Sequence, residues 1–183
     1  MLDWNPQLYL KFRNERTQPS IDLVNRIQLQ HPKRIIDIGC GPGNSAQILL
    51  NRWPKSDIIG LDNSIKMIEQ ANKDYPEQKW ILGDASTLNT ENKFDIVFSN
   101  ATLQWIPNHE TLIPNLFNLV NDGGVLAVQI PRFENMPLHT AIQNTAKTER
   151  WKIYTKNCEE RFTFHDYKFY YDLLAKISNR IEM

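Results

Sequence analysis

Short apolar runs alternate with amphipathic segments along the first 130 residues of the chain. Five runs are expected to be strands, because they are short and continuously apolar: 34–38, 57–62, 79–82, 94–100 and 125–130. Segments with helical spacing lie between or before them: 18–27, 45–53, 64–73 and 109–120. Pro19 is expected in the first turn of its helix, and Asp122-Gly123-Gly124 in a turn. This alternation predicts an α/β fold, a doubly wound parallel sheet with both faces covered.

Polar residues follow the ends of four predicted strands. A glycine loop follows 34–38, and Asp62, Asp84 and Asn100 end or follow the next three strands. Ligands of open parallel sheets bind at the carboxyl ends of the strands, which meet at one edge. The sequence therefore predicts a binding site at this edge.

The glycine loop lies within the stretch IIDIGCGPGNS (35–45). Gly39, Gly41 and Gly43 let the backbone turn sharply and approach a ligand closely. A dinucleotide-binding loop has the pattern G-x-G-x-x-G, which fits a pyrophosphate. Here the third glycine comes one residue early, and Asn44 stands in its expected place. The loop therefore favours a ligand without phosphates.

The acids of the same edge indicate the rest of the ligand. Asp37, two residues before the first glycine, would attract a cation. Asp62 can accept hydrogen bonds from two ribose hydroxyls, and Asp84-Ala85 can meet the exocyclic amine of an adenine. S-adenosylmethionine fits a ligand with adenine, ribose and a positive, phosphate-free tail.

Charge and composition exclude several other classes of protein. Lys+Arg and Asp+Glu both number 21, and this balance argues against a nucleic-acid or membrane-surface role. Cys40 and Cys158 form neither a disulfide framework nor a zinc site, and the four histidines show no ligand spacing, so no metal is expected. No signal peptide or membrane-spanning stretch is visible, so we expect a cytoplasmic protein.

Four motifs in combination resemble the class I S-adenosylmethionine-dependent methyltransferases: DIGCGPGN, LDNS, GDA and FDIVFSN. The N-terminal DWNPQLYLKFRNERTQPSIDLVNRI and the later NATLQWIPNHETL and GGVLAVQIP further resemble the trans-aconitate methyltransferase family. That family makes a methyl ester of a small polycarboxylate. The resemblance runs from residue 3 to about residue 131 and implies a Rossmann-like class I sheet that uses S-adenosylmethionine.

The resemblance assigns roles to individual residues. It implies that the methionine part of the cofactor is held by the loop residues Asp37, Gly39, Gly41 and Gly43. It places the ribose at Asp62 and Asn63, the adenine at Asp84 and Ala85, and the methyl-transfer side at Asn100. It implies a segment that closes over the substrate and contains Trp4, Asn5, Pro6 and Tyr9. Gln104 and Trp105 would lie near the acceptor carboxylate.

The implied chemistry needs no general base, because a carboxylate is already an anion at pH 7. Alignment and desolvation can supply most of the rate enhancement. Trp105 can donate its indole N–H and Gln104 its amide to the acceptor. A polycarboxylate also needs cations, and the candidates are Arg13, Arg16 and Arg132.

Each of these residues also has a purely structural interpretation. The glycine loop can be a tight turn without a ligand, Asp37 can brace that loop, and Asp62 can cap the helix that follows it. Asp84 can be a turn residue, and Trp105 can be a packing residue.

The chain is interpreted as one methyltransferase domain, 1–183. It comprises an N-terminal cap segment and helix at 1–30, a cofactor-binding core at 31–131, and an incomplete C-terminal part at 132–183. A class I sheet usually has seven strands; five end by Ile130, and a sixth is expected to begin in the last residues. The last one or two strands are therefore expected to be missing. We expect a natural short variant, a fragment, or a chain that covers its sheet edge by self-association.

The leading function is a carboxyl O-methyltransferase acting on a small carboxylic acid, with trans-aconitate as the expected acceptor. One alternative is a cofactor-binding but catalytically impaired shortened methyltransferase. Another is a methyltransferase for a different carboxylate, such as a malonyl-carrier thioester. A nicotinamide-dependent oxidoreductase is the third, and the early third glycine argues against it.

Overall fold

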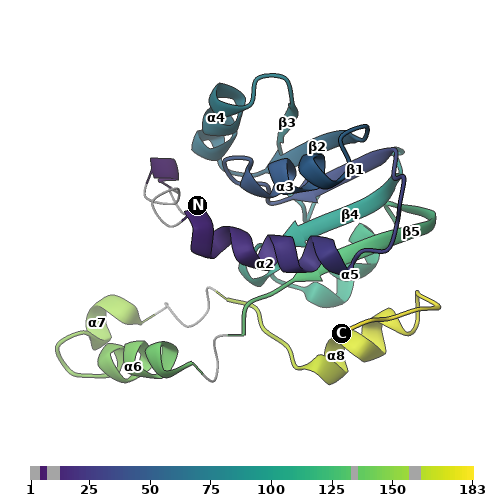
Figure 1. Ribbon diagram of the computed structural model, residues 1–183. Coiled ribbons are helices and arrows are strands. Elements are labelled where there is room, and N and C mark those ends of the chain that lie inside the picture. The colour runs from purple at the N-terminus through teal and green to yellow at the C-terminus, as the bar shows by residue number, and fades with distance from the viewer. Residues whose placement is uncertain (1–4, 8–12, 133–135, 157–161) are drawn as a thin grey trace.

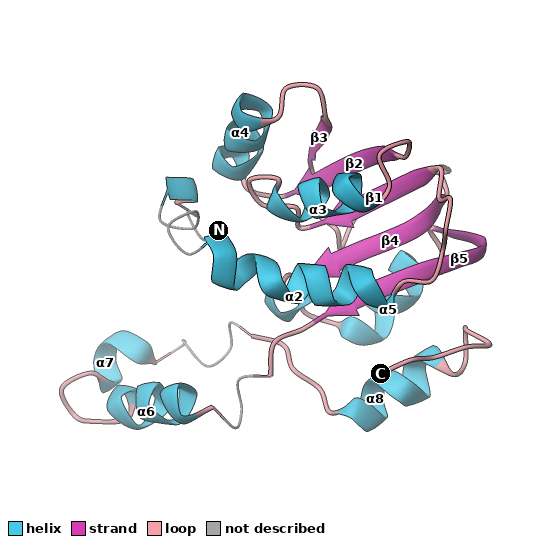
Figure 2. Ribbon diagram, viewed as in Figure 1, coloured by secondary structure: helices cyan, strands magenta, loops and turns pink. Residues whose placement is uncertain are grey.

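Five parallel strands form a single sheet in the computed structural model, which describes residues 5–7, 13–132, 136–156 and 162–183 (Figures 1 and 2). Their spatial order is β3-β2-β1-β4-β5, as expected for a doubly wound sheet whose chain starts in the middle. The strands have these bounds: β1 Arg34–Ile38, β2 Asp57–Asp62, β3 Lys79–Leu82, β4 Phe94–Asn100 and β5 Val120–Gln129. The first four strands match the predicted ranges.

Helices connect the strands and continue beyond them. Those of the first part of the chain are α2 Arg13–Arg26, α3 Asn44–Arg52, α4 Ile65–Asp74, the 3₁₀ helix η1 Leu103–Trp105, and α5 His109–Phe117. Those of the last part are α6 Pro137–Ala146, α7 Lys152–Thr155 and α8 Tyr167–Leu174. None of the helices in the described ranges is long and apolar enough to cross a membrane.

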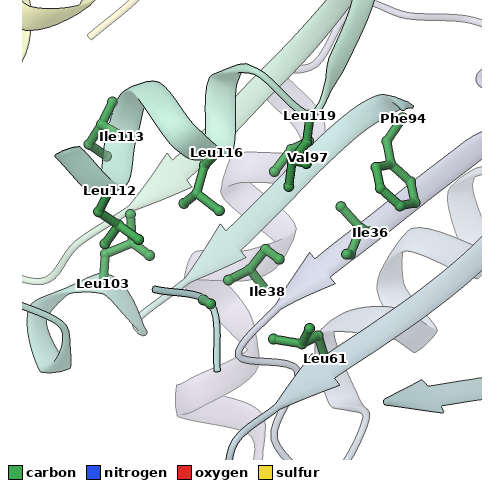
Figure 3. Close-up of a cluster of buried hydrophobic side chains, with 11 residues drawn as sticks. Ile36, Ile38, Leu61, Phe94, Val97, Leu103, Leu112, Ile113, Leu116 and Leu119 are labelled. Atoms are coloured by element: carbon green, nitrogen blue, oxygen red, sulfur yellow. The ribbon is translucent and has the colours of Figure 1, made fainter. Parts of the chain in front are cut away.

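The core consists of two clusters, one on each face of the sheet. Alternate residues of a strand point to opposite faces, so Ile35 joins the cluster under α2 and α3, whereas Ile36 joins the cluster under α5. Figure 3 shows this second cluster, in which Leu112 and Leu116 of α5 pack over the strands. The predicted sheet with both faces covered is therefore confirmed.

Helix α2 begins earlier than predicted. It starts at Arg13, so Pro19 lies inside the helix rather than in its first turn. An interior proline removes one backbone hydrogen bond from a helix. Val24 near the end of α2 is buried against the sheet, and this tertiary packing offsets the lost bond.

The turn predicted at Asp122-Gly123-Gly124 is wrong, because these residues belong to β5. Phe94 pairs with Val120, but Ile96 pairs with Val125, so β5 carries extra residues against β4 there. Such a bulge needs a residue with unusual dihedral angles, and Gly123 has φ +75°. The strand therefore starts five residues before the predicted position.

The sixth strand expected at the end of the chain is also wrong. Residues 175–183 are described and contain no strand. Helix α8 precedes them, and its Leu173 and Leu174 pack against the α5 side of the core. Helices α6 and α7 lie to one side of the sheet (Figure 1).

Candidate active site

The strand register brings the predicted site residues to one edge of the sheet. Asp62 pairs with Leu82 at the ends of β2 and β3, and Asn100 pairs with Gln129 at the ends of β4 and β5. Asp37 lies one residue before the end of β1, between these two pairs. The predicted residues at or near the ends of β1, β2 and β4 therefore lie at one edge of the sheet, which is where the sequence predicted them.

The glycine loop after β1 is fixed by its own backbone. The N–H groups of Gly39 and Cys40 donate to the carbonyl of Leu61 at 2.7 and 3.1 Å, and that of Gly43 donates to the carbonyl of Cys40 at 3.0 Å. The N–H of Gly41 donates to a carboxylate oxygen of Asp62 at 2.9 Å. These four amide groups all have partners within the protein, so they are not directed at a ligand.

Gly39 and Gly41 both have positive φ values, +73° and +54°, but their surroundings differ. A Cβ on Gly39 would lie 2.1 Å from Oγ1 of Thr102, so this glycine is required by packing. A Cβ on Gly41 would meet no atom within 4 Å. The backbone of Gly41 therefore borders open space that a ligand can approach.

Asp37 is a fully buried acid with one free oxygen. Its Oδ2 accepts a hydrogen bond from the Ser45 hydroxyl at 2.5 Å, while its buried Oδ1 has no partner among the described residues. Burial raises the pKa of Asp37 to about 7, the Ser45 bond opposes this, and the charge of Asp62 adds to it. A buried carboxyl oxygen without a partner suits a cationic ligand group.

Asp62 joins the glycine loop to helix α4. One carboxylate oxygen accepts the Gly41 N–H, and the other accepts the Ser64 N–H at 2.9 Å. Burial raises the pKa of Asp62, and these backbone hydrogen bonds oppose the rise. Each oxygen keeps acceptor capacity, which is what two ribose hydroxyls require. The N-cap of α4 is Ser64, which accepts from the Met67 N–H, so Asp62 is not the capping residue itself.

The remaining residues expected near the ribose (Asn63) and near adenine (Asp84 and Ala85) differ in how enclosed they are. Asn63 and Asp84 are exposed, whereas Ala85 is buried. One oxygen of Asp84 accepts from both the backbone N–H and the hydroxyl of Ser86, at 2.8 and 2.7 Å. This local turn agrees with the purely structural interpretation of Asp84 as a turn residue.

Gln104 and Trp105 lie in η1, directly after the end of β4. Gln104 is buried; its amide donates to the Ala101 carbonyl at 2.7 Å, and its buried Oε1 has no partner in the described part of the chain. Trp105 packs against Phe162, with 4.6 Å between ring centroids. One amide hydrogen of Gln104 is thus used by the backbone, which leaves the second for an acceptor.

Several expected substrate residues lie outside the described residues. Trp4 and Tyr9 are among them, as are the side chains of Arg13 and Arg16, whose backbones begin α2. Arg132 is exposed, and its guanidinium lies 4.6 Å from the ring centroid of Tyr167.

Sequence reasoning missed further buried polar side chains that have atoms without partners. Among the described residues, buried polar atoms without partners occur on Thr17 of α2, Asn44 and Gln47 of α3, and Gln129 of β5. Buried polar groups in folded proteins almost always have hydrogen-bond partners. Gln129 carried a readable signal, because it is the single polar residue in the apolar run VLAVQI.

Comparisons with known proteins agree with this geometry. The family described as "Methyltransferase domain" matches residues 35–124. The chain is similar to the trans-aconitate 2-methyltransferase of Variovorax paradoxus, with 39% identity over 185 residues covering 100% of this chain and 71% of the relative. It is 44% identical over 151 residues to that of Methylobacterium radiotolerans, covering 82% of this chain and 58% of the relative. The chain thus spans only part of the length of these relatives.

Solved structures show the same fold at low sequence identity. Phosphoethanolamine N-methyltransferase 2 of Haemonchus contortus, in complex with S-adenosyl-L-methionine, has a TM-score of 0.67 at 18% identity, covering 87% of this chain and 36% of that chain. An amino pentose methyltransferase of Micromonospora echinaspora has a TM-score of 0.60 at 20% identity, covering 73% and 59%. These structures show that the chain has the class I methyltransferase fold. The match to the Variovorax paradoxus relative shows that the chain belongs to the trans-aconitate 2-methyltransferase family.

Proposed function

We propose that the carboxyl edge of the sheet binds S-adenosylmethionine and that the chain methylates a carboxylate of trans-aconitate. When bound, this cofactor supplies an electrophilic methyl group on a sulfonium. The observation that carries the proposal is the buried, unpartnered Oδ1 of Asp37 beside a glycine loop whose Gly41 borders open space. The names of the relatives support trans-aconitate as the acceptor.

The residues of this edge fit such a ligand better than they fit a dinucleotide. A pyrophosphate site needs free backbone N–H groups, but those of Gly39, Cys40, Gly41 and Gly43 already have protein partners. The carboxyl groups of Asp37 and Asp62 would also repel phosphate. The same carboxyl groups attract a sulfonium and an ammonium group. This arrangement argues against the nicotinamide-dependent oxidoreductase.

We assign the parts of the cofactor as the family resemblance implies. Asp37 and the glycine loop would hold the cationic methionine part, and Asp62 with Asn63 would hold the ribose. Ala85, which is buried, would pack against adenine next to Asp84. Asn100 ends β4 between this half of the edge and η1, so it would face the methyl-transfer side.

The remaining task of the chain is to hold the acceptor. A carboxylate oxygen of the acceptor attacks the methyl group without losing a proton, so no general base is required. The rate enhancement then comes from aligning the acceptor and from excluding water. The free amide hydrogen of Gln104 and the indole N–H of Trp105 would orient the acceptor carboxylate. Both residues are held in one short turn, which fixes their relative direction.

The proposal is tested by incubating the chain with S-adenosylmethionine and trans-aconitate and identifying the products by mass spectrometry. We expect a monomethyl ester of trans-aconitate together with S-adenosylhomocysteine. Citrate and a malonyl-carrier thioester serve as competing acceptors, and Asp62→Asn serves as the cofactor-site control. Methylation of the thioester in preference to trans-aconitate would establish the other carboxylate substrate. Cofactor binding without any methyl transfer would establish the impaired methyltransferase instead.

Self-association across the β5 edge and a cytoplasmic location stay predictions. β5 pairs with β4 on one side only among the described residues, so its other edge offers unpaired backbone groups. Light scattering on the purified chain would detect the self-associated form. A monodisperse monomer that binds no hydrophobic dye would contradict it.

A further inference from the structure

His109 has hydrogen-bond partners on both nitrogens of its ring although it is fully buried. Its Nδ1 lies 2.7 Å from the Tyr170 hydroxyl, and its Nε2 lies 2.8 Å from the Leu103 carbonyl. Tyr170 belongs to α8, Leu103 belongs to η1, and His109 is the first residue of α5. One side chain therefore connects two neighbouring elements, η1 and α5, with α8, which lies 61 residues further along the chain.

The partners determine which nitrogen carries the hydrogen. A carbonyl oxygen only accepts, so Nε2–H donates to Leu103 and Nδ1 accepts from the Tyr170 hydroxyl. Burial lowers the pKa of His109, which favours this neutral form, and the nearby His165 acts in the same direction. The ring of His165 lies 5.4 Å from that of His109, between centroids. The imidazole is thus held in one tautomer and one orientation.

The Leu103 carbonyl is the first of three consecutive attachment points on η1. The next residue, Gln104, accepts a hydrogen bond at its carbonyl from the Thr163 N–H at 2.8 Å. The third, Trp105, packs on Phe162. Each residue of η1 is therefore fixed by a partner outside η1, and His109 supplies the partner that is fully buried.

We propose that His109 is a positioning residue for the acceptor side of the site. Its Nε2–H fixes the start of η1 and so sets the direction of Gln104 and Trp105, while Tyr170 holds the ring from α8. This role rests on the proposed function, since it assumes that η1 orients the acceptor carboxylate. Helix α8 thereby becomes part of the support of the site, although none of its residues needs to contact the substrate.

Two substitutions separate this role from simple core packing. His109→Gln places an amide N–H close to the position of Nε2, so it keeps a donor for Leu103 and loses the acceptor for Tyr170. His109→Asn places its amide close to Nδ1, so it keeps a partner for Tyr170 and loses the donor for Leu103. Both variants delete ring contacts and a hydrogen bond, so a packing role predicts similar behaviour for the two.

The experiment compares kcat and KM for trans-aconitate, the Kd for S-adenosylhomocysteine, and the free energy of unfolding. For His109→Asn we expect kcat to fall about tenfold or more, because the lost bond releases the turn that aims the acceptor. For His109→Gln and Tyr170→Phe, which lose the bond between the ring and α8 but keep the donor for Leu103, we expect a smaller loss of kcat, about twofold to threefold. The cofactor Kd is expected to stay within about twofold in all three. Equal kcat losses in His109→Asn and His109→Gln, or losses that follow stability alone, would overturn the proposal.

Hydrogen exchange tests the same proposal without turnover. The Trp105 and Ile106 N–H groups donate to the carbonyls of Thr102 and Leu103 within η1. We expect these amides to exchange about tenfold faster in His109→Asn than in His109→Gln. Equal exchange would overturn the positioning role, whereas absence of methyl transfer in the unchanged chain would overturn only the proposed function. If His109→Asn does not fold, the comparison uses Tyr170→Phe and His109→Gln, which both keep the donor for Leu103. Exchange of the Trp105 and Ile106 amides at the rate of the unchanged chain in both variants supports the proposal. Faster exchange of these amides in both variants contradicts it.

Discussion

Replacing Gly41 by alanine distinguishes a ligand-binding loop from a tight turn. Gly41 has φ +54°, and an added Cβ would meet no protein atom within 4 Å. The chain offers a matched control in Gly123, which has φ +75° and equally open surroundings. Gly123 lies in the β5 bulge, at the opposite end of the strand from Gln129 and the candidate site. The two variants therefore share the same strain and differ in their distance from the proposed ligand.

The effect on stability is small and similar at both positions. An L-residue in the left-handed region costs about 1–2 kcal/mol. Alanine also lowers the conformational entropy of the unfolded chain, which offsets about 0.4–1 kcal/mol of this cost. The net loss is then about 1 kcal/mol, which lowers the melting temperature by roughly 2–4 °C in a chain of this size. Neither variant is expected to unfold.

The effect on ligand binding is expected to differ. The new methyl group of Gly41→Ala would occupy space that the methionine part of the cofactor needs, so affinity should fall about tenfold or more. Calorimetric titration with S-adenosylhomocysteine measures this, with Gly123→Ala expected to bind like the unchanged chain. Equal affinities in the two variants would refute the placement of a ligand against Gly41, and the loop would then be only a turn.

Three further predictions follow from the described contacts. Because the pKa of Asp37 is raised to about 7, its negative charge is lost as pH falls through that value. Affinity for S-adenosylhomocysteine should therefore weaken by up to about tenfold per pH unit below 7. In a series of titrations at different pH values, Asp37→Asn should abolish this dependence. Asp95→Ala should destabilise the fold by about 1–2 kcal/mol in urea without changing cofactor affinity, since Asp95 accepts from the Lys33 and Arg34 N–H groups and from Asn121 at the other end of the sheet. Gln104→Leu should lower kcat/KM for trans-aconitate about tenfold at constant cofactor Kd, and a matching loss of cofactor affinity would contradict its acceptor role.

The same shift in Asp37 affects the stability of the chain without ligand. The folded form holds the proton up to about pH 7, while the unfolded form releases it near the ordinary value of 3.8. The contribution of Asp37 to stability is therefore present below that ordinary value and declines as pH rises toward 7. Asp95 acts in the opposite direction: partial burial opposes its ionisation, but hydrogen bonds from Asn121, Arg34 and Lys33 lower its pKa, so its contribution is lost on acidification.

Local sequence was sufficient for the first four strands, because each is a short run rich in apolar residues. β1, β2 and β4 are largely buried, whereas the edge strand β3 is mostly exposed. Local sequence was insufficient for β5. An Asp-Gly-Gly segment has the same local signature in a turn and in a bulge, and the choice depends on its pairing with β4. Asp95 of β4 contributes to this pairing, because its carboxylate accepts a hydrogen bond from the Asn121 amide, 26 residues away.

The residues of the candidate site could likewise be predicted only in part. The acids that end strands could be predicted, because the carboxyl ends of parallel strands must meet at one edge. The unpartnered Thr17 and Gln47 could not, since their burial arises from packing of α2 and α3 on the sheet. His109 and Tyr170 are 61 residues apart, and only tertiary structure brings α8 onto α5.

The central claim is that the carboxyl edge of this sheet binds a phosphate-free adenosyl ligand whose amino-acid part carries an ammonium group. A calorimetric titration of the unchanged chain with S-adenosylhomocysteine, beside one with NAD, tests it most directly. The account predicts one tight site for S-adenosylhomocysteine that Asp62→Asn weakens by about tenfold or more, and no comparable binding of NAD. A folded sample that gives no heat with S-adenosylhomocysteine, or that binds NAD more tightly, would contradict it.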